Sequence, residues 1–213
     1  RTPLSRTLSQ LDTAVAAAKD EMDSVIAVRA LIGRARVLEL MGRAGEALTS
    51  ARMAREIAAS IRVAPQESGG AIDDPKVVAR GEVQSLVALD VMSRALLLLG
   101  RWREARDAVV EVVKAFDERG MVALSARAQV TLGDTWFYED DLTHAAEAYG
   151  RALETARIVG EPSVLGLARF RKALVDMERG AFDRAREGYE AAIMAFRTAA
   201  DRGAEAAVQS YLA

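Results

Sequence analysis

The sequence contains no cysteine and no asparagine, and aromatic residues make up only 5% of it. The absence of cysteine excludes disulfide bonds, thiol nucleophiles and most zinc sites, and it fits a reducing compartment, so a cytoplasmic location is expected. The longest apolar runs, such as residues 95–99, are far shorter than a membrane span, so no membrane interaction is predicted. The 29 basic and 31 acidic residues leave a net charge of −2 without charged blocks, which disfavours direct nucleic-acid binding.

What the chain does have is an internal repeat. Four segments read alike when they are aligned on Ala47, Ala105, Ala145 and Ala185, and the last three of these lie forty residues apart. The interval between the first two is stretched to fifty-eight residues by a segment at 62–74. A fixed period of this length is typical of stacked supersecondary units.

Small residues recur at fixed places in each copy. Ala35, Ser93, Gly133 and Ala173 occupy one position and face the aligned alanines, as expected where two antiparallel helices cross closely. The turns hold Gly42, Gly100, Asp140 and Gly180, which favour or tolerate a left-handed conformation. Larger residues just after the turns, Trp102, Leu142 and Phe182, are expected to fill the gap between neighbouring pairs. A generic helical bundle with accidental spacing is the alternative.

The pattern predicts an all-α fold, a right-handed superhelix of antiparallel helix pairs. Prolines at helix starts and glycines between pairs (Gly120, Gly160, Gly203) set the boundaries. We expect helices near 3–19, 24–41, 45–61, 76–98, 102–117, 121–138, 142–158, 162–178, 182–199 and from about 203. The chain 1–213 then forms one array, with repeats at 24–61, 76–117, 121–158 and 162–199 and partial repeats at 1–19 and 203–213, so both ends are expected to be truncated. Segment 62–74 is interpreted as a surface loop, with a functional lid as the alternative.

The residues Leu132, Gly133, Trp136, Ala145, Tyr149 and Ala152 resemble the tetratricopeptide repeat (TPR) family. The family's common repeat is about thirty-four residues, whereas these repeats run to forty. Longer repeats of this kind resemble those of kinesin light chains and of the sensor arms of large bacterial ATP-dependent transcription regulators. The use of only four lysines beside many arginines favours a bacterial origin.

The resemblance implies a concave groove, lined by the first helix of each pair, that binds a protein, a peptide or a small effector. The groove candidates on these helices are Arg29, Arg36, Asp90, Arg94, Arg127, Asp134, Tyr138, Phe170 and Glu178. Four arginines among them could bind an acidic peptide through bidentate pairs, or they could simply be solvated surface side chains. Tyr138 and Phe170 allow a third interpretation, in which the groove prefers apolar cargo. The carboxylate clamp of co-chaperone members of the family uses asparagines, so it cannot be mapped onto this chain.

No catalytic constellation is convincing, so the chain is not expected to be an enzyme and no cofactor is implied. The only histidine, His144, is interpreted as an exposed helix residue. The acidic run 139–141 could be imagined as a metal site, but acids in such a turn more often cap the next helix. Trp136 is expected in the core, with Phe137 and Tyr138 nearer the groove.

Two functions therefore stay open. The chain could be the sensor or partner-binding region of a larger bacterial regulatory protein, or a freestanding scaffold that assembles other proteins. Self-association through exposed end repeats would fit either of them.

Overall fold

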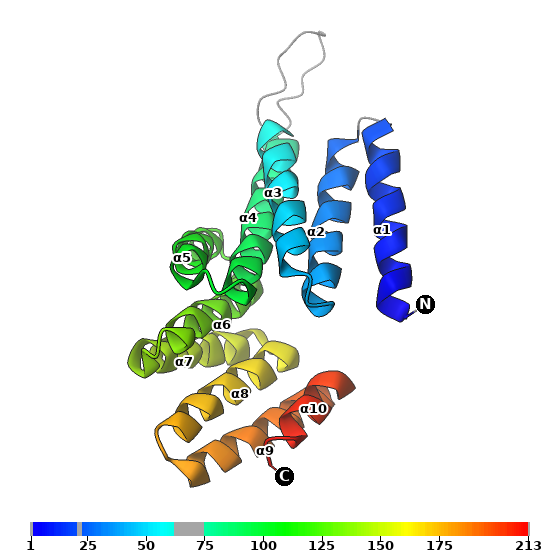
Figure 1. Ribbon diagram of the computed structural model, residues 1–213. Coiled ribbons are helices and arrows are strands. Elements are labelled where there is room, and N and C mark those ends of the chain that lie inside the picture. The colour runs from blue at the N-terminus through cyan, green and yellow to red at the C-terminus, as the bar shows by residue number, and fades with distance from the viewer. Residues whose placement is uncertain (1, 21–22, 62–74, 213) are drawn as a thin grey trace. The chain divides into compact units, whose positions relative to one another are not determined.

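The chain folds into helices joined by short turns, with no strand among the described residues 2–20, 23–61 and 75–212 of this computed structural model (Figure 1). The helices are α1 (Pro3–Asp20), α2 (Ser24–Leu40), α3 (Ala44–Ser60), α4 (Pro75–Leu98), α5 (Trp102–Glu118), α6 (Val122–Tyr138), α7 (Leu142–Val159), α8 (Pro162–Glu178), α9 (Phe182–Thr198) and α10 (Arg202–Gln209). The expected boundaries agree to within about a residue. The predicted loop 62–74 lies outside the described residues.

Two compact units make up the chain, residues 1–108 and 109–213, and the division falls within α5. In the first unit α2 packs on α3, α3 packs on α4, and α1 packs on α2. In the second unit α6 pairs with α7, α8 pairs with α9, and α10 packs on α9. Contacts also join successive first helices, α2 with α4 and α6 with α8. This is the arrangement of stacked antiparallel helix pairs that the repeat predicts.

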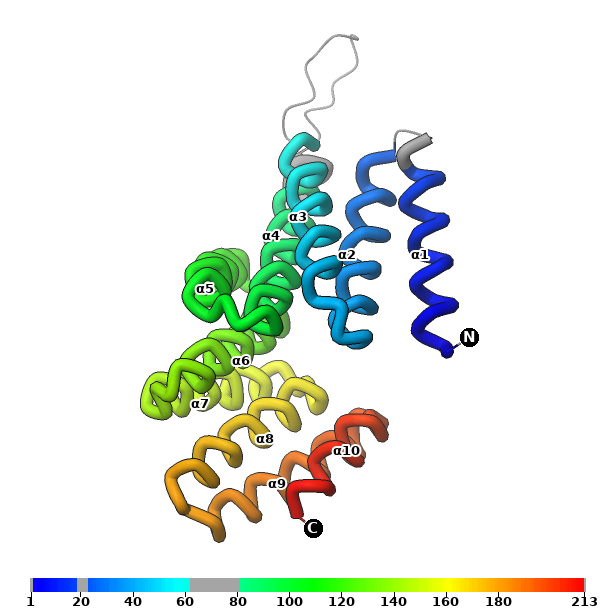
Figure 2. The backbone as a smooth tube through the Cα atoms, in the orientation of Figure 1, coloured from blue at the N-terminus to red at the C-terminus, as the bar shows by residue number. Residues whose placement is uncertain are grey.

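The turn within each pair has one geometry, visible as tight reversals of the backbone in Figure 2. Gly42, Gly100, Asp140 and Gly180 all have positive φ, between 64° and 73°. One backbone hydrogen bond closes each turn, for example Arg43 N to the carbonyl oxygen of Leu38 at 2.9 Å. The left-handed residue satisfies carbonyls at the end of the first helix, which is why the sequence places glycine there.

The turns between pairs use the same geometry, with one departure from the prediction. Gly120 and Gly160 have positive φ as expected, but the equivalent place before α10 is held by Ala200, with φ 55°. Gly203, predicted to separate these segments, lies inside α10 instead. The repeat frame requires a left-handed residue at 200, so a non-glycine residue adopts that conformation there at a cost of roughly 1–2 kcal/mol.

Each pair is held together where small residues meet, and these residues are fully shielded. Ala35, Ser93, Ala47, Ala145 and Ala185 are all 0% exposed. At Gly133 the helices approach so closely that an added Cβ would lie 2.3 Å from Cε1 of Tyr149. The small residues therefore set the spacing of the pair, as the sequence pattern indicates.

The expectation that a large residue after each turn fills the gap between pairs is only partly correct. Leu142 packs against the core of the second unit, and the guanidinium of Arg179 reaches its carbonyl oxygen from the next pair. Phe182 is 64% exposed and Trp102 is 36% exposed, so neither is a core residue. Phe182 belongs to the last complete pair, and the short α10 that follows does not cover it.

Candidate functional site

In the first unit, the first helix α2 presents one line of exposed side chains. Along α2 the exposed residues Ile26, Arg29, Arg36 and Leu40 recur at helical spacing, so they share one face. Ile26 is 48% exposed and Leu40 is 74% exposed. We call these four residues the α2 face. It combines two positive charges with two apolar contacts.

Arg94 lies beside this helix, but its charge is already matched. Its guanidinium pairs with Glu39 of α2 at 3.2 Å and with Asp90 of α4 at 2.6 Å. Burial raises the pKa of the Glu39 carboxyl, and Arg94 opposes this shift. Two acids around one base leave this buried cluster with a net negative charge when all three groups are ionised. Of the residues predicted to line a groove, Asp90 and Arg94 therefore lock α4 to α2 in this structure.

The second unit contains a similar buried ion pair between its own first helices, α6 and α8. We call these two interhelical ion pairs, Glu39–Arg94 and Asp134–Arg171, the locks. Arg171 of α8 pairs with Asp134 of α6 at 2.9 Å, and the hydroxyl of Tyr149 donates to the same carboxylate at 2.6 Å. Tyr149 is fully buried, and burial raises the pKa values of both Asp134 and Tyr149. In each unit the earlier first helix supplies the acid and the next first helix supplies the arginine.

Such buried pairs define geometry more than they add stability. Removing two charges from water costs most of what their attraction returns, whereas breaking one partner leaves an uncompensated charge. Each of these pairs joins two successive first helices, so the loss of one partner would weaken the contact between those helices. Glu39, Tyr149 and Arg171 are not among the predicted site residues. The Glu39–Arg94 and Asp134–Arg171 pairs depend on how successive helix pairs are placed against each other, whereas the Tyr149–Asp134 hydrogen bond lies within one helix pair.

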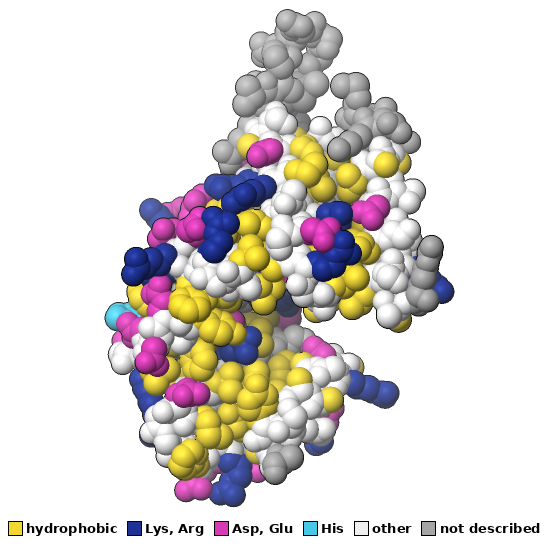
Figure 3. All heavy atoms as spheres, in the orientation of Figure 1, with side chains coloured by type: hydrophobic (Ala, Val, Ile, Leu, Met, Phe, Trp, Pro, Cys, Tyr) yellow, Lys and Arg dark blue, Asp and Glu magenta, His cyan; other side chains and the backbone are white. Residues whose placement is uncertain are grey.

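The groove candidates of the second unit that are exposed lie on α6 and α8. Arg127 and Tyr138 are exposed on α6, with Tyr138 at 51%, and Asp134 lies between them on the same helical face. We call Arg127, Asp134 and Tyr138 the α6 face. Glu178 is exposed at the end of α8. Apolar side chains gather over α8 on the side shown in Figure 3.

Phe170 lies away from these exposed groups. Its ring packs at 5.9 Å from that of Tyr189 and at 5.1 Å from that of Tyr211, so it belongs to an aromatic cluster with α9 and the segment after α10. The hydroxyl of Tyr189 is buried in this cluster and has no hydrogen-bond partner among the residues that the structure describes. Phe170 is therefore engaged in intramolecular packing.

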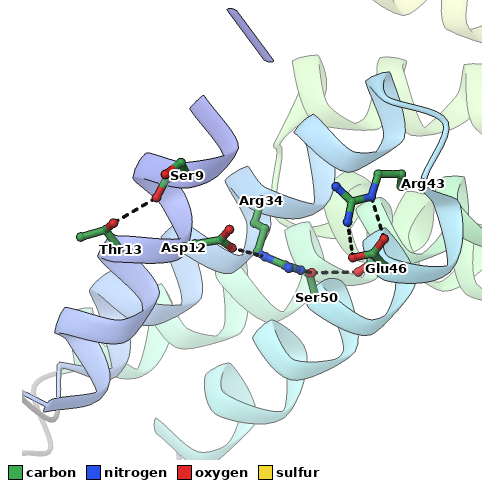
Figure 4. Close-up of polar contacts among 7 residues, drawn as sticks. All are labelled: Ser9, Asp12, Thr13, Arg34, Arg43, Glu46 and Ser50. Atoms are coloured by element: carbon green, nitrogen blue, oxygen red, sulfur yellow. Dashed lines mark hydrogen bonds and ion pairs between the residues drawn. The ribbon is translucent and has the colours of Figure 1, made fainter. Parts of the chain in front are cut away.

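A further arginine ties the first three helices together. Arg34 pairs with Asp12 of α1 at 2.7 Å and donates to the hydroxyl of Ser50 on α3 (Figure 4). The hydroxyl of Ser50 donates in turn to the carbonyl oxygen of Glu46 within α3. This network packs α1 onto the first complete pair. It is structural, since all of its groups find partners within the unit.

His144 and its acidic neighbours have structural roles. Asp141 caps α7 by accepting from the backbone N–H of His144 at 3.0 Å, and its other oxygen lies 2.7 Å from Nδ1 of the ring. These bonds lower the pKa of Asp141. The ring of His144 stacks on Trp136 at 4.8 Å. The prediction that this acidic run caps the next helix is confirmed, and His144 is exposed as expected.

Neither a metal site nor a membrane span is found in the part of the chain that the structure describes. No group of three or more His, Asp or Glu side chains there is arranged to hold a metal ion. No described helix has both the length and the apolar character needed to cross a bilayer.

Comparison with known proteins shows which solved structures have a similar fold. No protein-family model and no curated protein matches the chain. Among solved structures it is similar to a Rap protein complexed with competence and sporulation factor, with a TM-score of 0.73 at 13% identity, over 89% of this chain and 48% of that one. Aspartyl phosphate phosphatase F from Bacillus subtilis gives 0.71 at 14%, over 96% and 52%. BtubC (BKLC) from P. vanneervenii gives 0.62 at 18%, over 98% and 89%.

These similarities establish the fold class. The chain has the all-helical, TPR-like repeat fold of the Rap proteins, and it spans about half the length of the first two structures. At this level of identity the likeness concerns the fold alone.

Proposed function

We propose that this chain is a partner-binding module that holds a protein or peptide segment on the exposed faces of its first helices. The observation that carries the proposal is the pair of buried locks, Glu39–Arg94 and Asp134–Arg171. A surface whose backbone positions are fixed before binding loses less entropy when a partner docks. In each unit such a lock lies beside a face whose other side chains remain exposed.

The chemistry of these faces favours an acidic segment with apolar residues. On the α2 face, Arg29 and Arg36 offer guanidinium groups to carboxylates, and Ile26 and Leu40 offer apolar contact. On the α6 face, Arg127 and Tyr138 offer the same combination. A purely apolar cargo that binds through Tyr138 is the second candidate, because that side chain is half exposed and tyrosine is a frequent anchor at interfaces.

We further propose that the module is the sensor or partner-binding region of a larger bacterial regulatory protein. The presence of competence and sporulation factor in one similar structure supports a fold that can hold a partner. A freestanding scaffold is the alternative, and a small effector or self-association through end repeats would be compatible with both. A nucleotide-binding module and a helix-turn-helix in the flanking sequence would favour the regulator.

The test is selection from a phage-displayed library of random peptides against the complete chain. We expect acidic peptides with interspersed apolar residues to be enriched, and their affinity to fall as salt rises. The double variant Arg29→Gln/Arg36→Gln should weaken binding of these peptides to the first unit by at least about tenfold. The matched control changes Arg52 and Arg151, exposed arginines on the second helices α3 and α7, to glutamine and should bind as the parent does.

Two results would count against the acidic-segment proposal. Enriched peptides could be apolar and indifferent both to salt and to the arginine variants, but lost in Tyr138→Ala, which would support apolar cargo instead. Equal losses in the first-helix variant and in the second-helix control would place binding elsewhere on the chain.

A further inference from the structure

A separate cavity lies in the second unit, between the end of α7, the start of α8 and the end of α9. Its volume is about 350 Å³, and its walls include the apolar side chains of Pro162, Leu165 and Met194. Arg157, Arg169 and Thr198 supply its polar part. Pockets that bind small molecules are typically about 300–1,000 Å³, mostly apolar, with a few polar groups that fix orientation. This cavity has that size and that composition.

The cavity is distinct from the exposed first-helix faces. Arg169 and Arg171 both come from α8, but residues two apart on a helix point about 200° away from each other. Arg171 faces α6 and its partner Asp134, whereas Arg169 faces α9 and the cavity. The inference below therefore does not depend on the proposed function.

Arg169 differs from the other partly buried arginines in its electrostatic partners. Arg94, Arg171 and Arg34 each have a carboxylate within an ion-pair distance. Arg169 has a single polar contact among the described residues, from Nη1 to the carbonyl oxygen of Ala191 at 3.0 Å. A guanidinium has five N–H donors. Most donors of a half-buried charge thus lack a protein acceptor at the wall of an apolar cavity.

The surroundings add positive potential. Arg157 also lines the cavity; among the described residues its ion pair is with Glu154 at 3.5 Å, and 60% of the Arg157 side chain is exposed. The start of α8 brings the positive end of one helix dipole to the cavity, but the ends of α7 and α9 bring two negative ends, so the helix termini do not favour an anion. The positive potential therefore comes from the two arginines, and the apolar wall favours a hydrocarbon body beside them.

We propose that this cavity binds a small carboxylate with an apolar body. The carboxylate would take paired hydrogen bonds from Arg169, with Arg157 adding attraction at the rim. The hydrocarbon part would lie against Leu165, Met194 and Pro162. A charge-assisted, bidentate guanidinium–carboxylate pair is the strongest contact these residues can offer, and it supplies the counter-charge that Arg169 lacks.

The probe for this proposal is octanoate, titrated into the full chain labelled with [¹³C-methyl]methionine. We expect a saturable chemical-shift change at the methyl group of Met194, which lines the cavity. Octanamide has the same hydrocarbon body without the charge and should bind at least about tenfold more weakly. Arg169→Gln should reduce octanoate affinity by a similar factor and leave octanamide affinity nearly unchanged. Arg151→Gln, on the exposed surface of α7, is the matched control.

Three results would overturn the proposal. They are the absence of a saturable change at Met194, equal affinity for octanoate and octanamide, and octanoate affinity that is indifferent to Arg169→Gln. Should that variant unfold, Arg157→Gln replaces it, since this exposed side chain is not needed for packing. Arg157→Gln should weaken octanoate binding by a few-fold, and an unchanged affinity would contradict the proposal.

Discussion

The close approach of α6 and α7 makes Gly133 the most revealing single position for the fold. Gly133→Ala adds one methyl group to a helix, which ordinarily stabilises that helix by about 1 kcal/mol. Here the new Cβ would lie 2.3 Å from Cε1 and 2.5 Å from Cδ1 of Tyr149, far inside van der Waals contact. Tyr149 is 0% exposed, so its ring has no free space into which it can move.

The expected loss follows from three contributions. Overpacking of a well-packed core costs about 1–3 kcal/mol. Displacing the ring also weakens its hydrogen bond to Asp134, which is 2.6 Å long and worth about 1.5–3 kcal/mol because the acceptor is charged. After the helix-propensity gain of about 1 kcal/mol is subtracted, we expect a net destabilisation of about 1.5–5 kcal/mol.

The control is Gly150→Ala in α7 of the same unit. Nothing lies within 4 Å of the position its Cβ would take, so this variant should be about 0.5–1 kcal/mol more stable than the parent. Equilibrium urea unfolding, followed by tryptophan fluorescence and circular dichroism, measures both variants. If Gly133→Ala were as stable as Gly150→Ala, the close-packed crossing of α6 and α7 would be refuted.

Three further predictions concern the same unit. Burial raises the pKa of Asp134 above its ordinary value, so the folded state binds this proton more tightly than the unfolded state does. The free energy of unfolding should then fall as pH rises from about 4 through the raised pKa, and Asp134→Asn should make that slope shallower, with Glu39 contributing the remainder; an unchanged slope in the variant would contradict it. Trp136→Ala should cost about 2–4 kcal/mol, because the ring is partly buried, and His144→Ala about 0.5–1 kcal/mol, because it loses one stacking contact and an exposed hydrogen bond to Asp141; equal losses in urea unfolding would be inconsistent with this packing. Ala185→Leu should cost about 1–3 kcal/mol at a fully buried crossing, whereas Ala207→Leu on the exposed side of α10 should stay within about 0.5 kcal/mol; similar unfolding midpoints would contradict this contrast.

The helices and turns could be predicted from the sequence because their determinants are local. A glycine or aspartate at the end of a first helix, a small residue at the crossing and a proline at a helix start each act within a few residues. The repeat then confirms each of them by recurrence. The turn at Ala200 could not be predicted in this way. Ala200 takes the left-handed conformation because its position in the repeat requires it, although alanine does not favour that conformation.

Only part of the predicted site could be inferred from the sequence. Spacing along one helix correctly groups Arg29 with Arg36 on one face, since that depends only on helical periodicity. It cannot reveal that Arg94 is paired with Glu39, fifty-five residues earlier, or that Phe170 packs on Tyr211. Those contacts depend on how one repeat is placed against the next. Of the four arginines expected to be able to bind an acidic peptide, Arg94 is therefore engaged in internal ion pairs.

The central claim, binding on the faces of the first helices, can be tested most directly by site-specific photo-crosslinking to a selected acidic peptide. A benzophenone side chain is placed at position 29 or 127 on the first helices, or at position 49 or 151 on the exposed surfaces of the second helices α3 and α7. The account predicts crosslinks from position 29, position 127 or both, and none above background from positions 49 and 151. Crosslinks confined to positions 49 and 151 would contradict it.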